Sequence, residues 1–90
     1  MATKTSIVTA MESKVGSHYG LWRIGLTHDL AERKRYWKDT ENLSVDYWSD
    51  WTTDSLSDAK DIESHFINKG TKGGTAGDLS NSKTVYVYIF

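Results

Sequence analysis

The sequence predicts a small α/β sandwich, in which helices flank a small, mainly antiparallel sheet and the elements follow the order β β α β α β. Short β-branched and aromatic runs alternate with two segments that have helical spacing, and capping residues stand before each helical segment. The chain has 90 residues and a hydrophobic content of 38%. A chain of this size buries a single core, so we expect one domain spanning residues 1–90.

The first two elements are expected to be paired strands. Residues 5–10, TSIVTA, form a short run rich in β-branched side chains. Residues 20–26, GLWRIGL, form a second apolar run after a polar connection that contains glycine. Two such runs close together in sequence are typical of neighbouring strands.

The segment THDLAERKRYWKD predicts the first helix, from about Asp29 to about Lys38. Thr27 or Asp29 can cap its N-terminus, and Glu32 follows Asp29 by three residues, the spacing of a capping box. Straight-chain helix formers fill most of the remaining positions.

The second half of the chain predicts a strand, a helix, a loop and a last strand. Residues 41–51 alternate in character and predict a strand. Residues 54–69 predict a helix that Asp54 or Ser55 caps and Gly70 ends. The glycine-rich residues 71–82 are expected to form a loop, and residues 83–90, KTVYVYIF, the last strand. Because this strand is apolar on both faces, we expect it to be central in the sheet or covered by a second copy in a homodimer.

Composition excludes several classes of protein. The chain has no cysteine, so neither a disulfide nor a thiolate metal site can hold the fold together. No segment approaches the ~20 apolar residues that a membrane helix needs, and the N-terminus has no apolar run of signal length. We therefore expect a soluble cytoplasmic protein without a membrane partner.

The formal charge of −1 conceals an uneven distribution along the chain. Residues 21–38 carry a net charge of +3, whereas residues 39–63 carry −7. A basic segment followed by an acidic one indicates a polar surface for a partner, although solvated faces of helices and loops explain the pattern equally well.

Two charged residues interrupt the apolar faces of the predicted helices. Arg33 stands three residues after Leu30 and four before Trp37, and Glu63 lies four residues after Ala59. A charge removed from water must be paired or otherwise satisfied. The two side chains therefore form a salt bridge or reach into water, or else they form a site where Glu63 holds a divalent cation and Arg33 faces an anionic substrate.

Two segments resemble a known family. RIGLTHDLAERKRYW resembles the second half of the GIY-YIG nuclease signature, with an Ile-Gly, a Thr two residues later, an Asp-Leu pair and an Arg on the helix. SDAKDIESHFINKG resembles that family's later helix, with Glu63 at the position of its metal-binding Glu. The resemblance extends from about Ser6 to Lys69.

The resemblance implies a fold with a small sheet flanked by helices, and hydrolysis of phosphodiesters with one divalent metal. Gly25 would then allow a close approach of the backbone, Arg33 would clamp the phosphate, and Glu63 would bind Mg²⁺ or Mn²⁺. The implied partner is nucleic acid, DNA in preference to RNA.

The chain departs from the family at both tyrosines. Arg23 stands where the YIG tyrosine is expected, and Val8 stands where the GIY tyrosine is expected. A phenol or an imidazole can act as a base, so Tyr19 and His28 are the candidates to replace them. The resemblance thus implies either a metal-dependent endonuclease or a degenerate derivative that binds nucleic acid without cleaving it.

Basic and aromatic side chains interleave on and beside the first predicted helix. The candidates for binding nucleic acid are Arg23, Lys34, Arg35, Tyr36 and Lys38. Cations contact phosphates and aromatic rings stack on bases, which favours a nucleic-acid partner. The alternative is a protein without enzymatic activity that binds a basic partner protein, or inhibits it, through its acidic residues 39–63.

Overall fold

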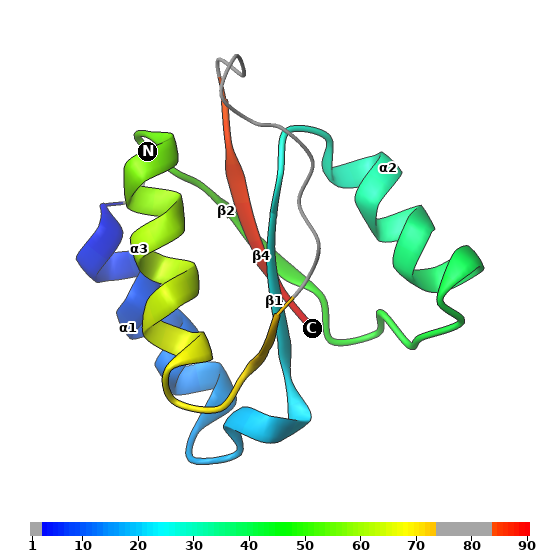
Figure 1. The fold of residues 1–90 in the computed structure, drawn as a ribbon, viewed down its shortest axis with the longest axis horizontal. Helices are drawn as coiled ribbons and strands as arrows, with labels where there is room; N and C mark the ends of the chain where they lie inside the picture. The colour runs from blue at the N-terminus through cyan, green and yellow to red at the C-terminus, as the bar shows by residue number, and fades with distance from the viewer. Residues whose placement is uncertain (1–2, 74–83) are drawn as a thin grey trace.

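The computed structural model describes residues 3–73 and 84–90, which form a sheet between two layers of helices. The helices are α1 (Lys4–Val15), α2 (Leu30–Arg35) and α3 (Leu56–Ile67), joined by the short 3₁₀ turn η1 (Tyr19–Leu21) and the π turn η2 (Tyr36–Thr40). The strands are β1 (Arg23–Thr27), β2 (Ser49–Thr52), β3 (Lys72–Gly73) and β4 (Tyr86–Ile89). Helices α1 and α3 cover one face of the sheet and α2 lies on the other (Figure 1), which confirms the expected α/β sandwich.

The strands lie in the order β2-β4-β1-β3. Strand β4 pairs antiparallel with both β1 and β2, and β3 adds a short parallel pairing to the outer edge of β1. The expectation that the C-terminal strand is central in the sheet is therefore confirmed. Because both edges of β4 are paired within the chain, the sheet lends no support to a homodimer formed through this strand.

The expected strand at residues 5–10 is wrong, because this segment belongs to helix α1. Ile7, Met11 and Val15 are each almost completely buried, and their spacing of four residues places them on one side of a helix. Thr3 caps the helix by accepting a hydrogen bond from the Ser6 backbone N–H over 3.2 Å. The helix penalty of β-branched residues is only a few tenths of a kcal/mol each, so burial of this apolar side outweighs it.

Each of the two later helices is capped by one of the two residues that the sequence offers. Asp29 Oδ1 accepts a hydrogen bond from the Glu32 backbone N–H, and Ser55 Oγ accepts one from the Asp58 backbone N–H, each over 3.1 Å. The first predicted helix changes character after α2, because residues 36–40 form the π turn that buries Trp37. The extra residue per turn in a π turn rotates the side chains that follow, and such turns are frequent at functional sites.

Two further expectations need correction. The strand expected at residues 41–51 is confined to Ser49–Thr52, and residues 41–48 form no strand. At the start of the expected loop, Lys72 and Gly73 form β3 by pairing with Arg23 and Ile24. Residues 74–82 of that loop lie outside the described residues.

The alternation of side chains divides the sheet into two chemically different faces. On the face toward α1 and α3, Ile24 and Leu26 of β1 meet Val87 and Ile89 of β4 in the main core. The other face carries Arg23, Gly25, Thr27, Tyr86 and Tyr88, since these residues alternate with the core positions. None of the described helices has the length and apolar character needed to cross a membrane.

Candidate functional site

The centre of the site is the tyrosine that lies over a glycine on the α2 side of the sheet. Gly25 and Tyr88 stand directly opposite each other in the antiparallel pairing of β1 and β4. A Cβ atom on Gly25 would collide with Oη and Cζ of Tyr88 and would lie 2.9 Å from its Cε2. The close approach expected at Gly25 is therefore that of the Tyr88 ring, which is completely buried.

A tryptophan from the π turn fixes the Tyr88 hydroxyl. Trp37 Nε1 donates a hydrogen bond to Tyr88 Oη over 2.8 Å. An indole N–H only donates, so the phenol oxygen must accept and keeps its own proton for another acceptor. Among residues 3–73 and 84–90, no group accepts that proton. Burial raises the pKa of Tyr88 and outweighs the opposing hydrogen bond from Trp37, so the phenol is neutral at physiological pH.

Three charged side chains act on this hydroxyl. After burial and the Trp37 hydrogen bond, the positive charge of Arg33 lowers the pKa of Tyr88, the negative charge of Glu63 raises it, and Arg23 lowers it. Charges act on a titrating group in this way only over short distances. The helices that carry Arg33 and Glu63 lie on opposite sides of the sheet, yet both charges act on the Tyr88 hydroxyl, although 30 positions separate the two residues in the sequence.

The guanidinium of Arg33 is only partly satisfied by its surroundings. Its Cζ lies 5.0 Å from the centre of the Tyr36 ring, and its Nε is buried without a hydrogen-bond partner in the described part of the chain. The described residues also show no ion pair between Arg33 and Glu63, so the salt bridge considered from the sequence is not formed. An unpartnered charged donor is costly when buried, and an anionic ligand would remove that cost.

Glu63 is half-buried, and within the described chain no hydrogen bond or ion pair reaches its carboxylate. Burial raises the pKa of Glu63, and the charge of Lys60 opposes this rise. The described residues contain no cluster of three or more His, Cys, Asp or Glu side chains, which argues against a zinc-type cage. Mg²⁺ binds through one or two carboxylates together with water and substrate phosphate, so the free Glu63 carboxylate fits such an ion.

Arg23, which stands at the family's tyrosine position, is held beside the site. Its Nη1 donates to the Gly73 carbonyl over 2.8 Å, and its Cζ lies 4.9 Å from the centre of a Trp37 ring. The hydrogen bond to β3 and the contact with the indole fix this cation on the same face as Tyr88. Arg23 thus adds positive charge where the resemblance implies a phenol.

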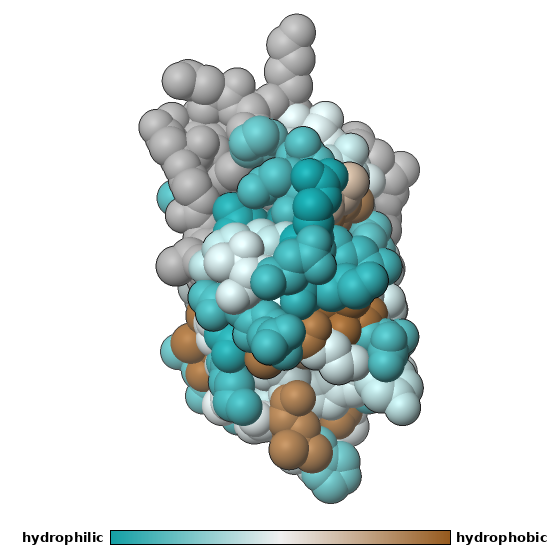
Figure 2. All heavy atoms as spheres, turned by 90° about the vertical axis from the view of Figure 1, so that its right-hand side faces the viewer, coloured by the Kyte–Doolittle hydropathy of each residue, from teal (hydrophilic) through white to brown (hydrophobic). Residues whose placement is uncertain are grey.

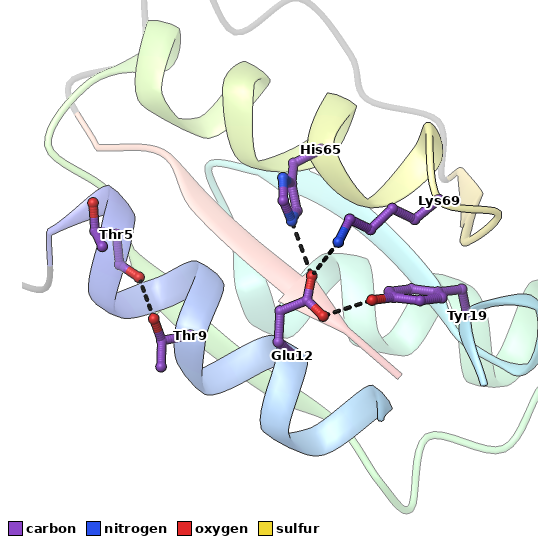
Figure 3. A network of polar contacts seen from close by, with 6 residues as sticks. All are labelled: Thr5, Thr9, Glu12, Tyr19, His65 and Lys69. Carbon is purple, nitrogen blue, oxygen red and sulfur yellow. Dashed lines mark hydrogen bonds and ion pairs between the residues drawn. The ribbon is translucent and has the colours of Figure 1, made fainter. Parts of the chain in front are cut away.

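In the described residues, neither candidate replacement base contacts Arg33. The Tyr19 hydroxyl donates to Glu12 Oε2 over 2.6 Å, and Glu12 Oε1 lies 2.9 Å from His65 Nε2 and 3.4 Å from Lys69 Nζ. This cluster joins α1 to α3 on the side away from α2 (Figure 3). His28 is exposed in the bend after β1.

The remaining basic candidates lie on the outer side of α2. Lys34, Arg35 and Lys38 are exposed and line an open hollow of about 740 Å³, which Asp39 and Asp46 also line. Figure 2 shows the largely hydrophilic surface on this side of the molecule. The carboxylates lower the positive potential of the hollow, so a polyanion gains less there than the number of cations suggests.

Tyr36, the ring expected to stack on bases, already has neighbours within the chain. Tyr36 contacts the Arg33 guanidinium and the Trp37 ring, and its hydroxyl donates to Glu41 over 2.9 Å. Trp48, from the segment before β2, stacks on Tyr88 with ring centres 4.6 Å apart. Tyr36 therefore positions Arg33, and Trp48 covers Tyr88.

Tyr88 is the functional candidate that the sequence analysis missed. Gly25 within an apolar strand was a signal, because an isolated glycine in a strand indicates the close approach of another group. The identity of that group depends on the pairing of β1 with β4 across more than 60 positions. No family model matches the chain, and neither the curated proteins nor the solved structures contain a significant match to it.

Proposed function

We propose that this protein binds the phosphodiester backbone of nucleic acid at Arg33 and hydrolyses it with a divalent metal ion held by Glu63. The observation that carries the proposal is the buried Nε of Arg33, which has no hydrogen-bond partner in the described residues. The carboxylate of Glu63 and the proton of the buried Tyr88 hydroxyl also lack a partner there, and Arg33 and Glu63 both act on that hydroxyl through their charges. A phosphodiester substrate requires hydrogen-bond donors and a source of a proton, and its metal ion requires a carboxylate ligand.

Arg33 and Tyr88 would both contact the phosphate. The planar guanidinium offers parallel N–H groups to two phosphate oxygens, and Tyr36 holds it in place. Trp37 already occupies the acceptor side of the Tyr88 hydroxyl, so Tyr88 would donate its proton to a phosphate or leaving-group oxygen. Because Tyr88 is completely buried, the Trp48 ring that stacks on it would have to move aside first. Arg23 adds a second positive charge that stabilises the developing negative charge.

Glu63 would hold the metal ion. Mg²⁺ or Mn²⁺, when bound, supplies Lewis-acid stabilisation of the phosphate oxygens. The chain itself contributes a half-buried carboxylate without a hydrogen bond or ion pair in the described residues, so no protein group has to be displaced when a cation binds. The raised pKa of Glu63 means that protons compete with the metal at acidic pH.

The resemblance to GIY-YIG nucleases supports this proposal in a modified form. The family's tyrosines are replaced in register by Arg23 and Val8, yet β4 delivers a phenol to the neighbourhood of Arg33 and Glu63. Tyr88 would thus supply the function that the family assigns to a tyrosine from another strand. A nucleic-acid substrate and a chain without cysteine agree with the cytoplasmic location expected from the sequence.

The acidic segment 39–63 gives weaker support to the alternative of a protein-binding or inhibitory role. Several of its acidic side chains are engaged within the chain. Glu41 accepts from Tyr36, Asp50 from Trp48, and Asp61 pairs with Lys4. The segment also runs from the α2 side of the sheet to α3 on the other side (Figure 1), so its charges do not form one continuous surface.

The experiment is an assay of labelled DNA and RNA with the purified chain in Mg²⁺ or Mn²⁺. We expect cleavage that chelation of the metal abolishes and that Arg33→Ala and Glu63→Ala each abolish. Binding without cleavage, with affinity that falls steeply as salt rises, would identify the degenerate form. Cleavage that survives both substitutions would overturn the assignment of the site.

A further inference from the structure

A small hollow beside the site combines apolar walls with positive charge. Two of the large apolar side chains exposed on the described surface, Leu21 and Leu43, line it, with 78% and 36% of their surface exposed. Its volume is about 160 Å³. The other side chains that matter here are Trp22, Phe90, Arg23 and Lys72.

No carboxylate side chain of the described residues lines this hollow. In this respect it differs from the larger hollow beside α2, where Asp39 and Asp46 stand among the lysines. Arg23 and Lys72 are the charged side chains that line the small hollow, so its occupant is expected to join an apolar body to an anion.

Arg23 connects the hollow to the phosphate site. Its side chain lines the hollow, and its Cζ lies 4.9 Å from the centre of a Trp37 ring. That ring contacts the Tyr36 ring, over which the Arg33 guanidinium lies. A ligand that fills the hollow would therefore lie next to a phosphate bound at Arg33. Nucleic acid joins an apolar body to an anion in this way, because a flat base is attached to each phosphate through a sugar.

We infer that the hollow holds one unstacked nucleobase next to the scissile phosphate, so that the substrate is single-stranded or locally unpaired nucleic acid. This inference rests on the proposed function, because it assumes that the phosphate lies at Arg33. A base inside a duplex has both faces covered by its neighbours and must leave the stack to enter. The hollow suits a single flat ring, since 160 Å³ leaves no room for the apolar face of a helix.

The test measures binding in the absence of metal, so that it does not depend on cleavage. Fluorescence anisotropy with EDTA would compare a short oligothymidine, an abasic strand of the same length and charge, and a duplex. We expect the chain to bind the oligothymidine about tenfold more tightly than the abasic strand, because contact with a base adds to the shared phosphate contacts.

The variant Leu21→Ser/Leu43→Ser should lose this preference and bind both strands with the affinity of the abasic one. Tyr47→Ser is the matched control, because Tyr47 is 74% exposed and does not line the hollow, and it should keep the preference. Circular dichroism would confirm that the variants are folded. If the double variant unfolds, Leu21→Ser alone is measured, because a side chain that is 78% exposed contributes little to the core.

A base preference that persists in the Leu variants, or a duplex bound as tightly as the single strand, would overturn the inference. Binding of an acidic apolar peptide that depends on Leu21, without a preference for bases, would also overturn it and assign the hollow to a protein partner. The two proposals fail separately. A leucine-dependent base preference without any cleavage would refute hydrolysis alone, whereas cleavage of a duplex that the Leu variants leave unchanged would refute the base site alone.

Discussion

The ring of Tyr88 covers the backbone of Gly25, and no side chain fits between them. This relationship places a buried hydroxyl on the α2 side of the sheet, where Trp37 donates to it and Arg33, Glu63 and Arg23 act on it through their charges. The site therefore depends on the pairing of two strands from opposite ends of the chain.

Gly25→Ala is expected to displace Tyr88 and to destabilise the fold by about 1–3 kcal/mol, because an added methyl group in a packed interior forces the ring aside. Denaturant unfolding followed by tryptophan fluorescence would measure the loss. Gly20→Ala is the matched control, since a Cβ there has no neighbour within 4 Å, and it should change stability by less than about 0.5 kcal/mol. Equal stabilities of the two variants would show that the ring does not lie over Gly25.

Tyr88→Phe removes the hydroxyl and leaves the Trp37 N–H buried without its acceptor. We expect a loss of about 1–3 kcal/mol in the free energy of unfolding, together with a fall in cleavage rate of about 10²–10⁴ if the phenol transfers a proton. Tyr86→Phe, two positions earlier on β4, should have little effect on cleavage. Full activity of the Tyr88 variant, once corrected for its folded fraction, would exclude the phenol from the chemistry.

The contrast between Tyr88 and the caps of the helices shows what the sequence can predict. Asp29 and Ser55 were identified because a cap and its partner lie within three residues, a distance that the sequence displays directly. Tyr88 was missed because its partners depend on strand pairing and on a π turn that positions Trp37 to donate to its hydroxyl. Local sequence patterns predict local hydrogen bonds, whereas contacts between distant segments can be identified only when the fold is known.

Glu63→Gln should abolish metal-dependent cleavage while leaving the protein as stable as before, or more stable, at pH 7. Burial raises the pKa of Glu63 in the folded chain, so the unfolded chain loses that proton first as the pH rises above its ordinary value near 4.5. The free energy of unfolding therefore decreases as the pH rises from the pKa of Glu63 in the unfolded chain to its pKa in the folded chain. A glutamine is neutral throughout and avoids this decrease. Urea denaturation at acidic and neutral pH would measure it.

The control for this prediction is Glu32→Gln, because Glu32 is exposed in the first turn of α2 and should give no gain in stability at neutral pH. A Glu63→Gln protein clearly less stable than the parent at pH 7 would contradict the account. It would mean that a hydrogen bond or ion pair satisfies the carboxylate.

Glu12→Gln should show the opposite dependence on pH. The hydrogen bond from Tyr19, followed by that with His65, lowers the pKa of Glu12 in the folded chain. The contribution of Glu12 to stability is therefore present at pH values above its ordinary pKa near 4.5, and it is lost as the pH falls through the pKa of the folded chain. The variant should be less stable at neutral pH, and the difference from the parent should vanish in acid. Asp61→Asn is the control, since its ion pair with Lys4 is exposed on both sides and is worth little.

Cleavage is expected to persist in Glu12→Gln, because the described contacts of Glu12 are with Tyr19, His65 and Lys69 and include none of the proposed site residues. Loss of cleavage in a folded Glu12 variant would instead assign Tyr19 and its partners to the site.

The N-terminal segment shows how a sequence pattern can mislead about the fold. Thr5, Val8 and Thr9 favour a strand by their shape, yet Ile7 and Met11 face the core at helical spacing. In α3 both signals agree, because Ala59, Ile62 and Phe66 are buried at helical spacing behind a serine cap, and that helix was predicted nearly to its ends. The secondary-structure propensity of the residues determines the type of element only where the burial of apolar side chains does not favour a different type.

The most direct test of the central claim is the rate of metal-dependent cleavage by Arg33→Lys, compared with the parent chain. Lysine keeps the positive charge but lacks the planar fork and the Nε that is buried without a partner in the described structure. We predict that the parent cleaves nucleic acid only in the presence of Mg²⁺ or Mn²⁺, and that Arg33→Lys, though folded, loses at least about tenfold in rate. A parent chain that neither cleaves nor binds nucleic acid, or an Arg33→Lys variant with the parent's rate, would contradict the account.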